Sequence, residues 1–265
     1  LSSMGAIGYF CGCVPGGKLG DLYGRKSVMV LGAAIVLYYA VLSGLAQNFF
    51  WICVFRFLVG MGIGAMPQLF TLLSEFMPTE NRGKSLMILG STFSLGGLYV
   101  GFMAVILIPT FGWRLWVIAC GLPVALFLLF SPFLPETPRY LLVSGREDLA
   151  KKILKPACDK INLDLDNYDI VLDRLEPRGQ YKDVFQPKYK ITTLVMLYNW
   201  FAINFIYYGV VLASSELIRL KSHMENPVFT DDDCHNTNCK PLTLGDLSSI
   251  MYASLPEMAC MIITG

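Results

Sequence analysis

The sequence predicts an all-α polytopic membrane protein, on the basis of its composition, its long apolar blocks and the distribution of its basic residues. Of its 265 residues, 54% are hydrophobic and only 15% are charged, whereas soluble domains carry about 25% charged residues. This much apolar surface cannot be hidden in one core of that size, and long apolar blocks indicate lipid as the solvent. The net charge of +1 and the lack of a basic stripe give no indication of nucleic-acid binding.

Seven apolar segments follow one another along the chain. The internal ones have the ~20 residues that a membrane-spanning helix requires, and the two end segments look like cut spans, so we expect a fragment of a longer protein. The segments are apolar all round, unlike amphipathic surface helices, and lack the strict alternation of β-barrel strands. The predicted segments are 1–16, 28–47, 49–73, 85–109, 114–134, 191–215 and 247–265.

The basic residues concentrate in every second loop. Loops 17–27, 74–84 and 135–190 hold sixteen of the 21 Lys and Arg residues, four lie in the other loops, and Arg56 lies inside a segment. Cytoplasmic loops of membrane proteins carry an excess of Lys and Arg. The pattern therefore predicts that these three loops face the cytoplasm and that the lipid bilayer surrounds the segments between them.

The loop after the sixth segment is acidic and carries Cys234 and Cys239. The alternation of loops puts it in the lumen or outside, where disulfides persist. Both cysteines are therefore disulfide candidates, with each other or with cysteines outside the chain. A metal site is the alternative, but Cys-x4-Cys matches no trusted zinc spacing, so we expect no metal. Since the sequence has no phosphate-binding Gly-x-x-x-x-Gly-Lys-Ser/Thr loop, we also expect no ATP use and no cofactor.

A motif of glycines and charges occupies the first basic loop: Gly17-x-x-x-Asp21-x-x-Gly24-Arg25-Lys26. Gly20 and Gly24 permit a tight turn between two membrane helices. Asp21 can pair with Arg25 and lie against the positive N-terminal end of a neighbouring helix. The alternative is a solvated interfacial loop.

This loop resembles the signature of the major facilitator superfamily, where it follows the second transmembrane helix. Three further stretches resemble the sugar-porter and organic-ion branch of that superfamily, namely Pro78–Gly83, Gly112–Arg114 and Pro135–Tyr140. The string Trp200–Leu212 is most similar to the synaptic-vesicle-two-related group. The resemblance extends over essentially the whole chain.

The resemblance implies a major facilitator fold with about seven of its twelve transmembrane helices present. Residues 1–134 would form the N-terminal transmembrane lobe without its first helix, and residues 135–190 a cytoplasmic inter-lobe linker with short helices. Residues 191–265 would begin the C-terminal lobe. Such proteins are integral multi-pass proteins of an intracellular vesicle or the plasma membrane.

The implied function is alternating-access transport of a small solute, with an organic ion as the favoured class. The alternative is a vesicle membrane protein of the same fold that binds or scaffolds without solute flux. A membrane enzyme is not expected, because no nucleophile–base pair and no metal-ligand cluster lies within a segment. The resemblance further implies that the motif containing Gly17, Asp21, Gly24, Arg25 and Lys26 is a gating loop.

Four charged residues are candidates for ion coupling or gating: Arg56, Glu75, Arg82 and Glu257. A charge inside a span costs about 2.5–3.5 kcal/mol, so Arg56 should face the bundle interior or water, and the resemblance associates it with coupling to a proton or another ion. Its alternative is snorkelling to the interface. The resemblance implies that Glu75 and Arg82 gate, and Glu257 is a candidate counter-charge for a cationic solute or a proton. Plain interfacial or lumenal carboxylates are the alternatives.

A group of polar and aromatic residues is predicted to line a central substrate cavity. Asn204 and Tyr208 are four residues apart and share a helix face, and aromatic rings hold organic cations. The alternative is packing against other helices or an aromatic belt. The cavity candidates are Gln68, Asn199, Trp200, Asn204, Tyr207 and Tyr208.

Two further predictions concern helices. Gly60 and Gly64 form a Gly-x-x-x-Gly face that allows close helix contact, and Gly62 does not share that face. In the long loop, an amphipathic helix is predicted over 146–155, with Pro156 as its limit.

Overall fold

The computed structural model describes residues 2–78, 80–160 and 183–225, and every regular element in these ranges is a helix. This confirms the predicted all-α class. The chain divides into two units, which are described separately. The predicted segment 247–265 and the linker residues 161–182 lie outside the described residues.

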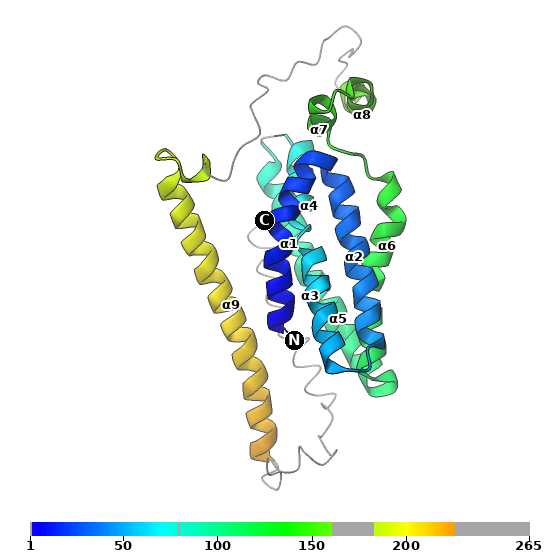
Figure 1. Cartoon of the computed structure of the whole chain (residues 1–265), viewed down its shortest axis with the longest axis vertical. Helices are drawn as coiled ribbons and strands as arrows, with labels where there is room; N and C mark the ends of the chain where they lie inside the picture. The colour runs from blue at the N-terminus through cyan, green and yellow to red at the C-terminus, as the bar shows by residue number, and fades with distance from the viewer. Residues whose placement is uncertain (1, 79, 161–182, 226–265) are drawn as a thin grey trace. The chain divides into compact units, whose positions relative to one another are not determined.

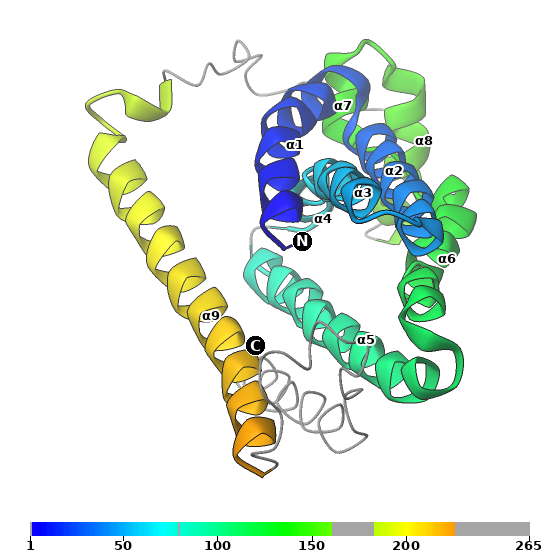
Figure 2. The ribbon, with the colours of Figure 1, turned by 60° about the horizontal axis from the view of Figure 1, so that its bottom comes forward.

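The first unit contains α1 (Ser2–Tyr23), α2 (Arg25–Leu45), α3 (Phe49–Ile63), α4 (Pro67–Phe76), α5 (Arg82–Ala119), α6 (Leu122–Phe130), the 3-10 helix η1 (Ser131–Phe133), α7 (Pro138–Val143) and α8 (Glu147–Lys160). The second contains the 3-10 helix η3 (Asp183–Phe185) and α9 (Lys190–Glu225). In the first unit, α3 packs against both α1 and α2, and α2 lies between α3 and α6 (Figures 1 and 2).

Within the described residues, four stretches are long and apolar enough to cross a membrane: Arg25–Leu45, Phe49–Phe76, Arg82–Phe133 and Lys190–Val211. The third has 52 residues, far more than the ~20 that one crossing uses. It contains the two predicted segments 85–109 and 114–134, and the turn predicted between them is present. Gly112 breaks the helical backbone there, with φ 80° and ψ 174°.

Several helix boundaries differ from the prediction. The predicted loop 17–27 is mostly helical, because α1 ends at Tyr23 and α2 begins at Arg25. Segment 49–73 is not one helix, because α3 ends at Ile63 and α4 begins at Pro67 after a short turn. Proline has no N–H to give, so it is tolerated at the first position of a helix. Pro156 does not end α8, which continues to Lys160, so that limit was wrong. A proline inside a helix removes one backbone hydrogen bond and crowds the preceding turn, which weakens the helix without necessarily ending it.

Small residues let the first three helices approach closely. The buried residues of α1 are all glycines spaced by four: Gly8, Gly12, Gly16 and Gly20. A side chain added at Gly8 or Gly12 would overlap the backbone of α3, at Phe57 and Met61 respectively. Residues four apart share one helix face, so α1 presents a continuous glycine face to α3 and to the start of α4. This is the packing expected in lipid, where backbones approach over small residues.

The glycines at the end of α3, and Gly64 directly after it, face two different helices. An added Cβ at Gly60 or Gly64 would meet the backbone of α1, at Gly5 and Gly12 respectively, which confirms the predicted close-contact face. An added Cβ at Gly62 would lie 2.8 Å from the carbonyl oxygen of Gly32 in α2. The α3 helix therefore sits between α1 and α2 with glycine against backbone on both sides.

We expect Gly12→Leu to destabilise the protein because the new side chain would overlap the backbone of α3. Overpacking of a close contact costs about 1–3 kcal/mol or more. Thermal unfolding of the purified protein in detergent measures the effect as a lower melting temperature. Gly17→Leu on the same helix is the matched control, since no atom lies within 4 Å of its added Cβ. Equal melting temperatures for the two variants would contradict the packing described here.

Candidate gating site

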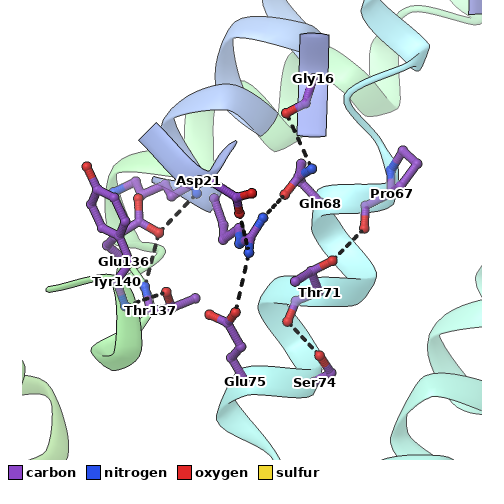
Figure 3. A network of polar contacts seen from close by, with 12 residues as sticks. Gly16, Asp21, Pro67, Gln68, Thr71, Ser74, Glu75, Glu136, Thr137 and Tyr140 are labelled. Carbon is purple, nitrogen blue, oxygen red and sulfur yellow. Dashed lines mark hydrogen bonds and ion pairs between the residues drawn. The ribbon is translucent and has the colours of Figure 1, made fainter. Parts of the chain in front are cut away.

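A cluster of charged and polar side chains joins α1, α2, α4 and α7 at the end of the bundle predicted to face the cytoplasm (Figure 3). We call it the clasp and define it by Asp21, Arg25, Gln68, Glu75 and Glu136. The clasp forms where α1 ends at Tyr23 and α2 begins at Arg25, so that a single residue, Gly24, connects the two helices.

Arg25 is the centre of the clasp. Its Nη2 atom lies 2.7 Å from the Asp21 Oδ1 atom and 3.7 Å from the Glu75 Oε1 atom. Its Nη1 atom donates a hydrogen bond of 2.9 Å to the Gln68 Oε1 atom. One guanidinium therefore holds a residue of α1 and two residues of α4 (Figure 3), a use of several fixed donors that lysine does not offer.

The two ion pairs of Arg25 differ in exposure. The Asp21 side chain is 54% exposed, and exposed pairs of this spacing contribute only about 0.3–0.5 kcal/mol. The Glu75 side chain is 14% exposed and that of Arg25 is 19% exposed, so water screens this pair much less. Removing one partner of a buried pair costs about 3–5 kcal/mol, because the other charge is left uncompensated. The Arg25–Glu75 pair therefore joins α2 to α4 together with the Arg25–Gln68 hydrogen bond.

Glu75 also has an oxygen with no partner in the described part of the chain. Its Oε2 atom is buried and accepts no hydrogen bond, whereas buried polar atoms are normally paired. The carboxylate is thus held by one guanidinium alone. In the described residues, no second donor would hold the Glu75 carboxylate in place if Arg25 moved away.

Gln68 is placed in the clasp by the structure. It is 6% exposed, accepts from Arg25 and donates through Nε2 to the carbonyl oxygen of Gly16 at 3.4 Å. An added Cβ at Gly20 would lie 2.6 Å from the Gln68 Oε1 atom, so the glycine face of α1 leaves the space that this side chain fills. Its predicted role in a substrate cavity stays a prediction.

Glu136 attaches α7 to the start of α2. Its Oε1 atom accepts from the backbone N–H groups of Lys26 at 3.2 Å and Thr137 at 3.1 Å. A carboxylate is favoured at a helix N-terminus, where backbone N–H groups are unpaired. The Tyr140 hydroxyl donates to the carbonyl oxygen of Leu22 at 3.0 Å. The segment after η1 is therefore joined to both helices that flank the glycine turn.

Gly24 has a backbone conformation open almost only to glycine, with φ 96° and ψ 151°. An added Cβ there would overlap the Glu136 Oε2 atom. Two separate requirements, the left-handed backbone and the space for the carboxylate, select glycine at this position. The predicted turn forms at Gly24 alone, because the other predicted turn residue, Gly20, is a buried residue of α1. The predicted Asp21–Arg25 pair is present. The other glycine of the motif, Gly17, lies within α1, where nothing approaches its added Cβ within 4 Å.

The remaining charged candidates lie apart from the clasp. Arg82 begins α5 and is exposed, and the arginine that contacts Glu75 is Arg25. Arg56 is half-buried in the first half of the Phe49–Phe76 span. Across residues 2–78, 80–160 and 183–225 it forms no salt bridge. Glu257 lies outside the described residues.

The cavity candidates of the seventh segment lie on α9. Six residues line an open groove along one face of this helix: Trp200, Phe201, Asn204, Phe205, Tyr208 and Gly209. Asn204 and Tyr208 share that face, as their spacing predicted, and the Asn204 amide donates to the Trp200 carbonyl oxygen at 2.8 Å. The Tyr207 ring meets the Tyr208 ring edge to face at 5.4 Å. Asn199 is exposed and does not line the groove.

The predicted disulfide candidates, Cys234 and Cys239, lie outside the described residues. Among the residues that are described, no three His, Cys, Asp or Glu side chains group as metal ligands would.

The sugar (and other) transporter family matches residues 1–229 of the chain. The chain belongs to this family, a branch of the major facilitator superfamily. It is a multi-pass membrane protein. The predicted resemblance is confirmed.

Relatives of known name agree with this membership. The synaptic vesicle 2-related protein of Xenopus laevis is 32% identical over 267 residues, which cover 100% of this chain and 48% of the relative. The protein of the same name from Bos taurus is 31% identical with the same coverage. The chain thus spans about half the length of the curated relatives it matches.

Solved transporter structures share the fold. The partially occluded inward open conformation of the xylose transporter XylE from E. coli matches with a TM-score of 0.54 and 23% identity, covering 60% of this chain and 44% of that one. The proton:xylose symporter XylE bound to 6-bromo-6-deoxy-D-glucose matches with a TM-score of 0.53 and 23% identity, covering 58% and 38%. The major facilitator fold predicted for this family member is confirmed.

Two features in and around the clasp were not anticipated. Glu136 and Tyr140 lie in the Pro135–Tyr140 string that indicated the family, but their contacts with the glycine turn join positions more than 100 residues apart. The glycine face of α1 was also missed, although the spacing of four from Gly8 to Gly20 is visible in the sequence.

We expect Gly24→Ala to lower the free energy of unfolding of this protein by at least about 2 kcal/mol. The causes are backbone strain and overlap with Glu136. In a Glu136→Ala background the overlap is gone, so the same change should cost less. Thermal unfolding of the four proteins of this cycle measures the difference. Gly145→Ala is the matched control, because Gly145 also has a positive φ of 73° but nothing within 4 Å of its added Cβ. A cost at Gly24 that is equal in both backgrounds would contradict the contact with Glu136.

Proposed function

We propose that this chain forms part of an alternating-access secondary transporter for a small solute, in which the clasp gates. Family membership supports transport. The observation that carries the gating proposal is Arg25 bound to Asp21, Gln68 and Glu75 at once. Secondary transporters rock one helical bundle against another around a central site. The clasp joins α1, α2 and α4 within the predicted N-terminal lobe, so it would gate by holding that end of the lobe in the arrangement that stabilises the closed state.

The clasp has the physical properties of a reversible contact. The Arg25–Glu75 pair is shielded from water yet long, at 3.7 Å, and Glu75 leaves its second oxygen unpaired. Such a pair stabilises one arrangement without the full set of hydrogen bonds that a permanent buried charge needs. Separation of α2 from α4 would hydrate both charges and offset part of the lost contact. We propose Gly17, Asp21, Gly24, Arg25 and Lys26 as the gating loop, with Glu75 and Arg82 as gating charges.

For the solute we propose an organic ion, with a cation as the first candidate. The support is the groove on α9, where Trp200, Phe201, Phe205 and Tyr208 surround Asn204. Aromatic faces attract organic cations, and asparagine in a membrane helix favours an inward face. A sugar is the second candidate, because the family takes its name from sugar transporters and XylE is a xylose transporter. Glu257 is proposed as a counter-charge for the cation.

For the energy source we propose a coupled ion, with Arg56 as a coupling residue. The support is a half-buried arginine within an apolar span, without a salt bridge in the described ranges. A charge in that setting is costly and usually functional. The fold neighbour XylE is a proton:xylose symporter, so a proton is the first candidate. The names of the relatives make a vesicle membrane the first location to test, ahead of the plasma membrane.

Uptake by the full-length protein in proteoliposomes tests the transport proposal, with organic cations, sugars and organic anions screened with and without a pH gradient. We expect accumulation of one solute class that requires the gradient. Arg56→Ala should abolish the response to the gradient, and Arg56→Lys should retain part of it because the charge remains. Specific solute binding without flux in every condition would instead support a binding or scaffolding protein. Unchanged coupling in Arg56→Ala would remove that residue from the mechanism.

A second set of variants tests the clasp. Arg25→Ala leaves Glu75 buried without a counter-charge, so we expect the maximal uptake rate to fall at least tenfold, the effect of ~1.4 kcal/mol on the balance of states. Arg25→Lys should give an intermediate rate, since one ammonium cannot reproduce the forked contact. Lys84→Ala, which removes an exposed charge outside the clasp, is the control for general electrostatics. A fall in rate that Lys84→Ala reproduces would argue against a specific gate.

A further inference from the structure

The segment that leads into α9 folds back onto the first turn of that helix. We call residues 183–190 the hook. The Thr193 hydroxyl of α9 donates to the Val184 carbonyl oxygen at 2.9 Å. Within the hook, the Gln186 side chain donates to the Asp183 carboxylate at 2.9 Å, and the Lys190 N–H donates to the Gln186 carbonyl oxygen at 2.9 Å. These bonds fix the position of the hook relative to the start of α9.

The position of the α9 span puts the hook at the membrane surface. The stretch Lys190–Val211 is apolar enough to span a bilayer, and a span of ~20 residues uses all of it. The hook is bonded to the first turn of this span, so it lies at the headgroup level of the leaflet that α9 enters. The basic loops predict that this leaflet is the cytoplasmic one, which carries the anionic lipids of a cell membrane.

The side chains of the hook match such an interface. Val184 is 46% exposed, Phe185 55% and Tyr189 49%. Burying one large apolar side chain contributes about 1.5–3 kcal/mol, so a partner that covers them is favoured. The Lys188 Nζ atom lies 5.2 Å from the centre of the Tyr189 ring. Tyrosine and lysine are the side chains that combine an apolar body with a polar end at membrane surfaces.

The positive charge of the hook favours a negatively charged partner. Lys188 and Lys190 give the hook two positive charges against one negative charge, and that negative charge, Asp183, already accepts a hydrogen bond from Gln186. Basic residues beside a membrane span attract anionic headgroups, at about 1 kcal/mol for each Lys or Arg. The apolar side chains would enter the acyl-chain boundary while the lysines contact the phosphates above it.

We propose that the hook is a binding surface for anionic phospholipid headgroups of the cytoplasmic leaflet, with Phe185 as its apolar anchor and Lys188 and Lys190 as its charges. Lipid binding by the hook is a property separate from transport, and it can be measured without solute flux. A lipid bound here would hold the entry point of α9 at a fixed depth. The alternatives for covering Phe185 are another segment of this chain or a second copy, and the test separates these from lipid.

The test uses photo-cross-linking in the full-length protein, with p-benzoylphenylalanine at position 185. The protein is reconstituted in nanodiscs of phosphatidylcholine with roughly one-third phosphatidylserine, a composition like that of an anionic leaflet. Mass spectrometry identifies the adduct, and we expect phospholipid. A peptide adduct, from this chain or a second copy, would overturn the proposal. The same probe at the buried Leu72, which is 5% exposed, is the control and should give peptide adducts.

The ratio of phosphatidylserine to phosphatidylcholine in the adduct at position 185 tests the charges. Removing both lysines with Lys188→Gln and Lys190→Gln should lower that ratio, by about fivefold for each lysine removed. Lys152→Gln with Lys155→Gln on α8 is the matched control, since it removes the same charge from other exposed positions. An unchanged ratio in the hook variant, or an equal fall in both variants, would overturn the proposal.

Discussion

The close approach of α1 to α3 and α4 is the contact on which the rest of the first unit depends. In lipid, helices gain little from burying apolar side chains, so they associate through close backbone packing and hydrogen bonds. The glycine face from Gly8 to Gly20 supplies the packing. Its last two members also supply the clasp, because the Gly16 carbonyl oxygen accepts from Gln68 and Gly20 leaves the space for that side chain. The close packing and the polar contacts of the clasp therefore share one helix face.

The paired charges and the unpaired arginine lie at different positions relative to the water boundary. The ion pairs of Arg25 lie at the end of the bundle predicted to face the cytoplasm, where water can hydrate the charges when the contact opens. Inside the apolar stretches, Arg56 is a charge without such compensation in the described residues. In the proposed gate, the polar contact at the water boundary would open and close while the apolar surfaces stay in lipid.

The clasp also connects the predicted N-terminal lobe to the predicted inter-lobe linker. Glu136 and Tyr140 come from the predicted linker, yet they bond to the turn between α1 and α2. A movement of Glu136 or Tyr140 would therefore act directly on the turn at Gly24. The backbone conformation of Gly24 and the space around it are both restricted. The division of the chain into lobes at residues 134 and 191 remains a prediction.

The sequence by itself determined the helical class, the family, most of the spans and two local features, the Asp21–Arg25 pair and the Gly60–Gly64 face. These follow from composition and short-range spacing, which a helix converts directly into shared faces. Only the tertiary structure decided that Gln68 and Glu75 share Arg25, that Glu136 fills the space beside Gly24, and that α3 separates from α4. Such contacts join residues far apart in the chain. Their partners depend on how closely the helices pack, which no local pattern encodes.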